Sequence, residues 1–259
     1  MKNHITKFFQ YKFLLTELVK KDIKLKYRRS VLGLFWTLLE PLLTMIVLTV
    51  VFSKLRGKSG GYFPVYILTG RLLYTFFSNS TKAAMKAIRT NSGMIKKVYI
   101  PKYIYPLSNV ISNFVIFLLS LPVLALVAIV LKVPITWHVI EGIIPLVLLF
   151  IMSLGVGMIL SAMAVFFRDI EYLWSVALML IMYCSAIFYE PESVIESGYA
   201  WVFSLNPLYA IITNFRNSII YGTSMDMNAL IYSTVFSFGS LIIGVWFFYK
   251  KQDKFILNI

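Results

Sequence analysis

Long apolar stretches constrain the fold of this sequence more than any other feature. A helix needs about 20 mostly apolar residues to cross a hydrocarbon core of roughly 30 Å. Six stretches reach or approach that length: 32–52, 63–84, 104–131, 142–166, 172–189 and 229–249. Of the 259 residues, 59% are hydrophobic and 14% are charged, whereas soluble domains carry about 25% charged residues. The predicted fold class is an all-α polytopic membrane protein with six transmembrane helices.

Two of these spans have special features. The third contains Pro106 and Pro122, so we expect it to begin with a bend near Pro106. The fifth is short, which favours tilt, local thinning of the bilayer or a broken helix. The predicted organisation is an N-terminal cytosolic segment 1–30, a membrane domain 31–252 and a cytosolic tail 253–259.

The basic residues indicate which side of the membrane each loop faces. Because the number of spans is even, both termini lie on the same side. With the termini in the cytosol, the cytosolic segments hold 19 Lys and Arg residues and the outer segments hold 5. Cytosolic loops carry an excess of these residues. We predict a multi-pass protein of the bacterial cytoplasmic (inner) membrane with both termini in the cytosol.

The formal net charge of +14 does not point to nucleic acid. Nucleic-acid binding needs basic residues gathered on one folded face, and here they gather at the ends of apolar segments. The single cysteine, Cys184, lies in an apolar run, and His4 and His138 are isolated. We therefore predict no disulfide, no metal site and no catalytic centre.

The sequence also lacks a phosphate-binding loop. Residues 57–59, Gly-Lys-Ser, resemble the end of such a loop, but Phe52 occupies the position where its first glycine is required. We predict that the chain is not an enzyme and binds no cofactor, so any energy for transport comes from another subunit.

Residues 5–29, ahead of the first span, are predicted to form an amphipathic interface helix. Apolar residues such as Leu15 and Ile23 share one face at helical spacing, and Lys24 and Arg28 lie opposite. Such a helix lies in the plane of the membrane interface. It serves either as an anchor alone or also as a docking surface for a cytosolic partner.

Two charged residues fall inside the predicted spans. Glu40 and Arg71 each lie about 12 Å deep at 1.5 Å per residue, counted from opposite faces of the membrane. Antiparallel neighbouring helices would bring them within roughly 6 Å in depth. We predict a Glu40–Arg71 pair, direct or through water, with a purely structural role as the alternative.

Aromatic residues cluster in the second and fifth spans. Facing inward they would form a stacking surface for sugar rings, and at the membrane interface they would form an aromatic belt. The candidates for a channel wall are Tyr66, Tyr74, Phe76, Phe77, Tyr183 and Phe188.

The predicted outer loop 190–228 is rich in apolar residues but too polar at its edges to form two more spans. Pro191 and Pro207 divide it into short pieces. We predict short re-entrant outer helices here, with an ordinary folded loop as the alternative.

The predicted cytosolic loop between the second and third spans contains an apolar piece, residues 94–100, bracketed by Gly93 and Pro101. It is long enough for about two helical turns. A solvated loop does not need Met94, Ile95 and Val98, whereas a short helix pressed against a partner protein does.

Three blocks of sequence carry a resemblance to a known family. The blocks RRSVLGLFWTLLEPLL, SGMIKKVYIPKYIYPL and LNPLYAIITNFRNSIIYG resemble the permease subunits of ABC-2 type exporters of polysaccharides, which export O-antigen, capsule, teichoic acid and related glycans. The similarity extends over nearly the whole chain. It implies a homodimer together with two copies of a cytosolic ABC ATPase subunit that binds ATP and Mg²⁺. The implied substrate is a lipid-linked polysaccharide that passes through a channel formed by the dimer.

The same resemblance implies roles for particular residues. Arg28 and Arg29, near the cytosolic entrance, are candidates to receive the phosphates of the substrate. The residues that match the ATPase-coupling helix are Met94, Ile95, Lys96, Lys97, Val98, Tyr99, Ile100 and Pro101. Those that match the outer gate are Pro191, Trp201, Asn206, Pro207, Tyr209 and Arg216. Family members often have Asn where this chain has Glu40, so the resemblance assigns Glu40 no role.

Three other functions stay open at this stage. An ABC-2 exporter of a drug or lipid would share these features. A secondary transporter would need titratable groups at the midplane, where Glu40 is the only candidate, and usually an internal repeat. A membrane-embedded glycosyltransferase or acyltransferase would have little beyond Asp169 and Glu171 to serve as catalytic acids.

Overall fold

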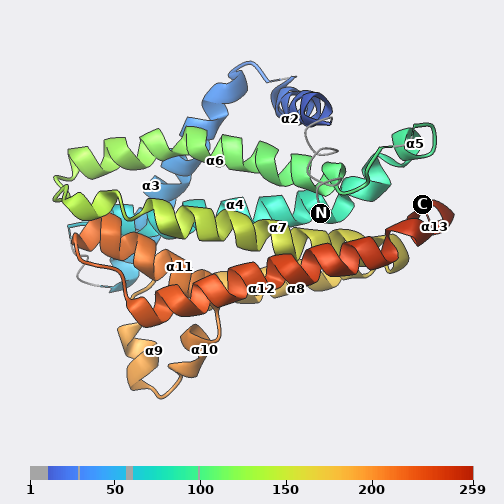
Figure 1. Cartoon of the computed structure of the whole chain (residues 1–259). Coiled ribbons are helices and arrows are strands. Elements are labelled where there is room, and N and C mark those ends of the chain that lie inside the picture. Colours follow the sequence, from blue (N-terminus) through green and yellow to red (C-terminus); the bar gives the residue numbers. More distant parts are fainter. Residues whose placement is uncertain (1–10, 29, 57–60, 99, 259) are drawn as a thin grey trace.

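The computed structural model describes residues 11–28, 30–56, 61–98 and 100–258, and the regular structure within these ranges is entirely helical (Figure 1). The prediction of an all-α fold is confirmed. In chain order the helices are α2 (Lys12–Tyr27), η1 (Gly33–Phe35), α3 (Trp36–Arg56), α4 (Phe63–Thr90), α5 (Ser92–Ile95), α6 (Ile104–Val130), η2 (Trp137–Val139), α7 (Ile143–Phe166), α8 (Ile170–Tyr183), α9 (Glu192–Glu196), α10 (Trp201–Ser204), α11 (Pro207–Arg216), η3 (Asn217–Tyr221), α12 (Met227–Lys251), η4 (Gln252–Lys254) and α13 (Phe255–Asn258).

Among the described residues, four helical stretches are both long enough and apolar enough to cross a membrane: Gly33–Phe52, Ile104–Val130, Trp137–Phe166 and Met227–Asn258. Each of them corresponds to one of the predicted spans. The second predicted span corresponds to α4, which has 28 residues and extends six residues further, to Thr90. The fifth corresponds to α8, whose 14 residues extend only about 21 Å at 1.5 Å per residue. The count of six crossings therefore stays a prediction.

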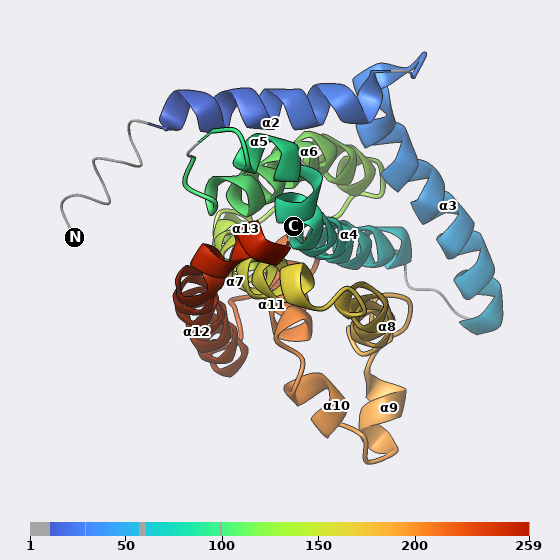
Figure 2. The same ribbon diagram turned by 90° about the vertical axis from the view of Figure 1, so that its right-hand side faces the viewer.

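Helix α4 lies at the centre of the bundle and packs against α6 and α7 (Figure 2). Its side chains Ile67, Leu68 and Leu73 are fully buried. Several of its polar residues are buried too, and the Thr81 hydroxyl donates to the carbonyl of Phe77, 2.8 Å away. A helix enclosed by other helices does not face lipid, which explains why α4 is more polar than the four apolar stretches.

Helices α7 and α12 cross at close range. A Cβ added to Gly155 would lie 2.4 Å from the backbone nitrogen of Leu241, and one added to Gly244 would lie 2.3 Å from the carbonyl oxygen of Gly155. Small residues at such a crossing let two backbones approach closely, which favours helix association in a membrane.

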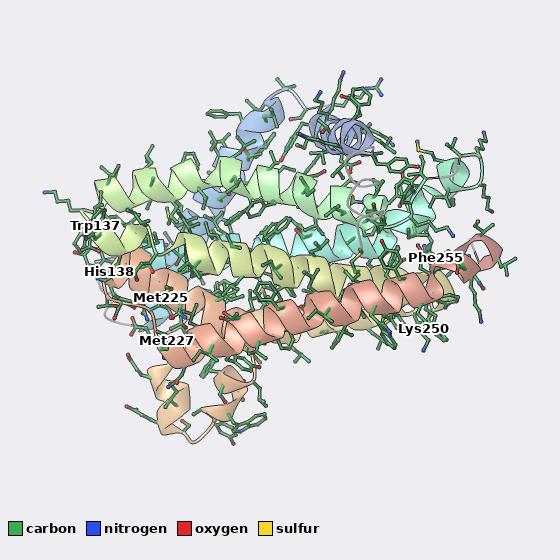
Figure 3. All side chains as sticks on the ribbon, in the orientation of Figure 1. Trp137, His138, Met225, Met227, Lys250 and Phe255 are labelled. Atoms are coloured by element: carbon green, nitrogen blue, oxygen red, sulfur yellow. The ribbon has the colours of Figure 1, made fainter. Side chains whose placement is uncertain are left out.

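The two ends of the bundle differ. At one end, called here the α5 end, lie α5, α13 and the Lys250 and Phe255 side chains, whereas Trp137 and His138 lie at the opposite end (Figures 1 and 3). Helix α2 lies across the bundle axis, and α3 leans away from the other helices (Figure 2). Leu18 of α2 joins a buried cluster at the α5 end that includes Phe255. Only the part of the predicted interface helix after residue 10 lies within the described residues.

Candidate functional site

A polar cavity of about 70 Å³ opens between α3, α4 and α6, beside the junction of α2 with α3. We call it the polar groove. Its charged, amide and hydroxyl-bearing lining residues are Lys26, Tyr27, Thr37, Glu40, Thr44, Arg71, Thr75, Asn79, Asn113 and Ser120.

The groove is polar because polar residues recur at helical spacing within predicted spans. Arg71, Thr75 and Asn79 lie four residues apart on α4, so they share one face. Asn113 and Ser120 lie seven residues apart on α6, again on one face. Polar residues at such depth usually face a bundle interior or a water-filled cavity. Our prediction identified Arg71 and missed the other four, although their spacing could have revealed them.

Glu40 and Arg71 both line the groove, but they do not form a direct pair. Among the described residues no ion pair within 4.0 Å joins them. The Nη1 atom of Arg71 instead lies 3.8 Å from Sδ of Met182. The alternative of a water-mediated pair stays a prediction.

A second hollow, of about 420 Å³, adjoins the groove beneath α2 and shares Lys26, Asn113 and Ile116 with it. Desolvation raises the pKa of Asp22, while Lys21 and a hydrogen bond from Ser112 partly offset this rise. Desolvation also lowers the pKa of Lys26, and the nearby Glu40 carboxylate partly offsets this change. The two hollows together present both signs of charge.

The amides of α6 also keep acceptors available at these hollows. Asn113 donates through Nδ2 to the carbonyl of Asn109 at 2.8 Å, and Asn109 donates to that of Tyr105 at 3.0 Å. The side-chain carbonyl oxygens of both residues can therefore still accept hydrogen bonds. Such a lining suits a ligand that carries hydroxyl groups and charge.

The predicted channel wall needs correction. Five of the six aromatic candidates are buried in the protomer: Tyr66, Tyr74, Phe76, Phe77 and Phe188. Four of them are buried because they belong to the enclosed helix α4, and the Tyr74 hydroxyl donates to the carbonyl of Leu178 at 3.0 Å. The ring of Phe188, which follows α8, stacks on that of Phe52. Of these five, Phe76 alone lines the polar groove, and it is only 3% exposed there. Tyr183, which is 55% exposed, is the exception.

The predicted outer-gate residues fall into two groups. Pro191 and Trp201 belong to the α9–α10 region, which lies outside the bundle (Figure 1). The remaining residues belong to α11 or its N-cap, and this helix buries Leu208 and Phe215. The ring of Tyr209 packs 4.8 Å from that of Phe203.

Asn206 and Pro207 determine where α11 begins. The Oδ1 atom of Asn206 accepts from the backbone nitrogen of Leu208 at 3.0 Å, and Pro207 occupies the first helical position. The Nδ2 atom of Asn206 donates to the carbonyl of Cys184 and to Oγ of Ser185. This residue therefore joins the start of α11 to the turn that follows α8.

The predicted coupling segment is shorter as a helix than expected. Helix α5 has only four residues, Ser92–Ile95, and turns follow it at Lys96 and Lys97. Ile95 is only 7% exposed and packs in the cluster with Leu18, so it anchors the segment instead of facing a partner.

The rest of the segment is more accessible. Met94, Lys96, Lys97 and Val98 are exposed, and Ile100 and Pro101 are half-buried. Tyr99 lies outside the described residues. Of the two predicted phosphate-binding arginines, Arg28 is exposed just after α2, and Arg29 also lies outside the described residues.

Among the described residues, no three His, Cys, Asp or Glu side chains lie close enough to hold a metal ion.

The chain is similar to known transport proteins. A family model described as "ABC-2 type transporter" matches residues 14–220. An O-antigen export system permease protein of Klebsiella pneumoniae is 29% identical over 93% of both chains. Its counterpart from Myxococcus xanthus is 31% identical over 82% of both chains. A polysialic acid transport protein of Escherichia coli is 22% identical over 92% of this chain and 93% of its own length.

Proposed function

Because the chain belongs to the ABC-2 type transporter family, we propose that it is the membrane-spanning permease subunit of an ATP-driven exporter of a lipid-linked polysaccharide. The observation that carries this proposal is the match to O-antigen permeases along 93% of both chains.

The proposed complex contains two copies of this chain and two copies of a cytosolic ABC ATPase subunit, which binds the ATP and Mg²⁺. The missing phosphate-binding loop supports a separate ATPase. The α5 end faces the cytosol in this arrangement, because the excess of Lys and Arg belongs to the segments at that end. Met94 and Val98 then face the ATPase.

The polar groove is the part of the protomer that we assign to the substrate. Its amides and hydroxyls suit the many hydroxyl groups of a sugar chain, and Lys26 and Arg71 suit the phosphates of a lipid carrier. In this assignment the groove, whose lining includes Phe76, replaces the predicted aromatic wall as the surface that the glycan meets.

A genetic experiment tests the proposal. The gene is deleted, and the strain is complemented with wild-type chain or with a groove-filling variant, Asn79→Leu. We expect deletion to remove the glycan from the cell surface and to cause its lipid-linked form to accumulate inside. We expect the variant to be produced normally but to restore export at least tenfold less well.

Other outcomes would identify the rival functions. Unchanged surface glycan together with altered drug sensitivity would indicate an ABC-2 exporter of drugs. Export that continues without the ATPase subunit would indicate a secondary transporter.

A further inference from the structure

Helix α8 packs loosely, yet specific bonds join it to α4 along its length. Of its residues only Leu178 is buried, and Tyr172, Leu173 and Val176 are 77%, 65% and 60% exposed. Its position therefore depends less on packing than on the bonds that follow.

At the α5 end, Glu171 joins the start of α8 to the end of α4. Its Oε1 atom lies 2.5 Å from Nη1 of Arg89, and its Oε2 atom lies 3.2 Å from Nζ of Lys86. One turn further, Nε1 of Trp174 donates to Oγ1 of Thr81 at 3.1 Å. The Glu171 side chain is only 20% exposed, so this ion pair is shielded from water more than a typical surface pair.

At the opposite end, Arg216 of α11 joins the turn after α8 to α4. Its guanidinium donates through Nη1 to the carbonyl of Ala186 and through Nη2 to that of Tyr66, each at 3.0 Å. It also lies 3.4 Å from the centroid of the Tyr66 ring. The Tyr66 hydroxyl donates to the carbonyls of Ala186 and Tyr189 at 3.0 and 2.8 Å.

Two features indicate that the contacts of Arg216 with Tyr66 and Ala186 are held firmly in place. Arg216 is 3% exposed, although removing a charge from water is costly unless hydrogen bonds compensate. Ala186 has a φ of +46°, a conformation that is uncommon for residues other than glycine. Both are features that persist only where surrounding contacts hold them in place.

We propose that α4 and α8 move as one strut, which carries displacement of the coupling segment to the turn at 184–189 and to α11. Helix α4 is continuous over 28 residues and ends two residues before α5 begins. Glu171 and Arg216 are the positioning residues at its two ends. This inference rests on the proposed function, because it assumes that an ATPase acts on the α5 end.

The first experiment changes the charges at the α5 end in the reconstituted complex with the ATPase. Glu171→Lys places three cations together, and Arg89→Glu places two carboxylates together. We expect each to lower export at least tenfold while ATP hydrolysis stays within twofold of wild type. The double variant Glu171→Lys/Arg89→Glu restores an opposite-charge pair, and we expect export within threefold of wild type. The control is Glu17→Lys on α2, which removes the exposed Glu17–Lys20 pair.

The second experiment displaces the Arg216 guanidinium without removing it. A Cβ at Gly70 would lie 2.6 Å from Nη2 of Arg216, whereas one at Gly239 would have nothing within 4 Å. We expect Gly70→Ala to lower the export per ATP hydrolysed at least fivefold and Gly239→Ala to leave it unchanged. Arg216→Lys keeps the positive charge but loses the planar guanidinium that donates both hydrogen bonds. We expect it to lower the export per ATP hydrolysed as Gly70→Ala does.

Several results would refute the proposal that α4 and α8 move as one strut. These are a parallel fall of ATP hydrolysis and export in the single variants, no recovery in the double variant, or an equal loss in the Glu17→Lys control. Full export by Gly70→Ala would also overturn it. If instead the wild-type complex exports no polysaccharide, the proposed function fails before the strut is tested, so the two failures are distinguishable.

Discussion

The exposed side chain of Val98 allows a quantitative prediction about ATPase docking. Val98 is 54% exposed, so a docked partner can bury about half of it. Val98→Ala removes two methyl groups, each worth about 0.8 kcal/mol when fully buried. Half of that total is about 0.8 kcal/mol, which corresponds to a roughly fourfold weaker Kd at 1.4 kcal/mol per tenfold. In the Val98→Asp variant, docking of the ATPase must also remove water from the new carboxylate. We therefore expect this substitution to weaken binding at least tenfold.

The assay is the affinity of the purified ATPase for the chain in lipid nanodiscs, measured by biolayer interferometry. Val235→Ala on α12 is the matched control, because Val235 is 68% exposed but lies about 22 Å along the helix from Lys250, which marks the α5 end. Ile95→Ala should behave differently, since a buried isoleucine typically costs 2–5 kcal/mol of stability when truncated. We expect it to lower the thermal unfolding midpoint, whereas the Val98 variants leave the midpoint unchanged. Unaltered affinity in Val98→Asp would refute the assignment of this surface to docking.

Three further predictions concern packing, charge and pH. Gly155→Ala would place a Cβ 2.4 Å from a backbone nitrogen of α12, so we expect about 1–3 kcal/mol of destabilisation; thermal unfolding in detergent should show it, with Gly239→Ala neutral or stabilising. Glu40→Gln and Arg71→Gln should each reduce export more than their double variant does if water joins the pair, whereas additive effects in the export assay would exclude any coupling. Asp22 has a raised pKa because of desolvation, so its charged form is disfavoured in the folded state, and the penalty grows as pH rises above the unfolded pKa of about 3.9. Asp22→Asn should therefore raise the unfolding midpoint at pH 7, and this gain should vanish below that pKa; an equal gain at both pH values would contradict the reasoning.

Much of the fold could be predicted because membrane spans have a strong compositional signal. The predicted stretch 104–131 matches α6 within one residue, and 142–166 matches α7 within one residue. The weaker predictions concern α8, which ends at Tyr183, and the coupling segment, whose helix ends at Ile95. Both depend on where a short helix stops, which is the least reliable part of a prediction from sequence.

The candidate site was harder to predict, because the site depends on which helices become neighbours. Arg71 stood out as a charge in a span, but Asn79 and Asn113 become one site only when α4 and α6 pack together. Arg216 matched the outer gate of the family, yet its contacts with Tyr66 and Ala186 join residues up to 150 positions apart. A local sequence pattern cannot predict such long-range contacts.

The amino-acid sequence by itself determined that this chain is a helical membrane protein, where most of its long helices lie and to which family it belongs. These properties follow from the length of apolar runs and from blocks of contiguous residues. The tertiary structure alone decided which side of each helix is buried. Phe77 is 3% exposed and Tyr183 is 55% exposed, although both are aromatic residues of predicted spans. In water, apolar residues mark the core, but in a bilayer the lipid-facing surface is as apolar as the protein interior, so hydrophobicity cannot distinguish the two.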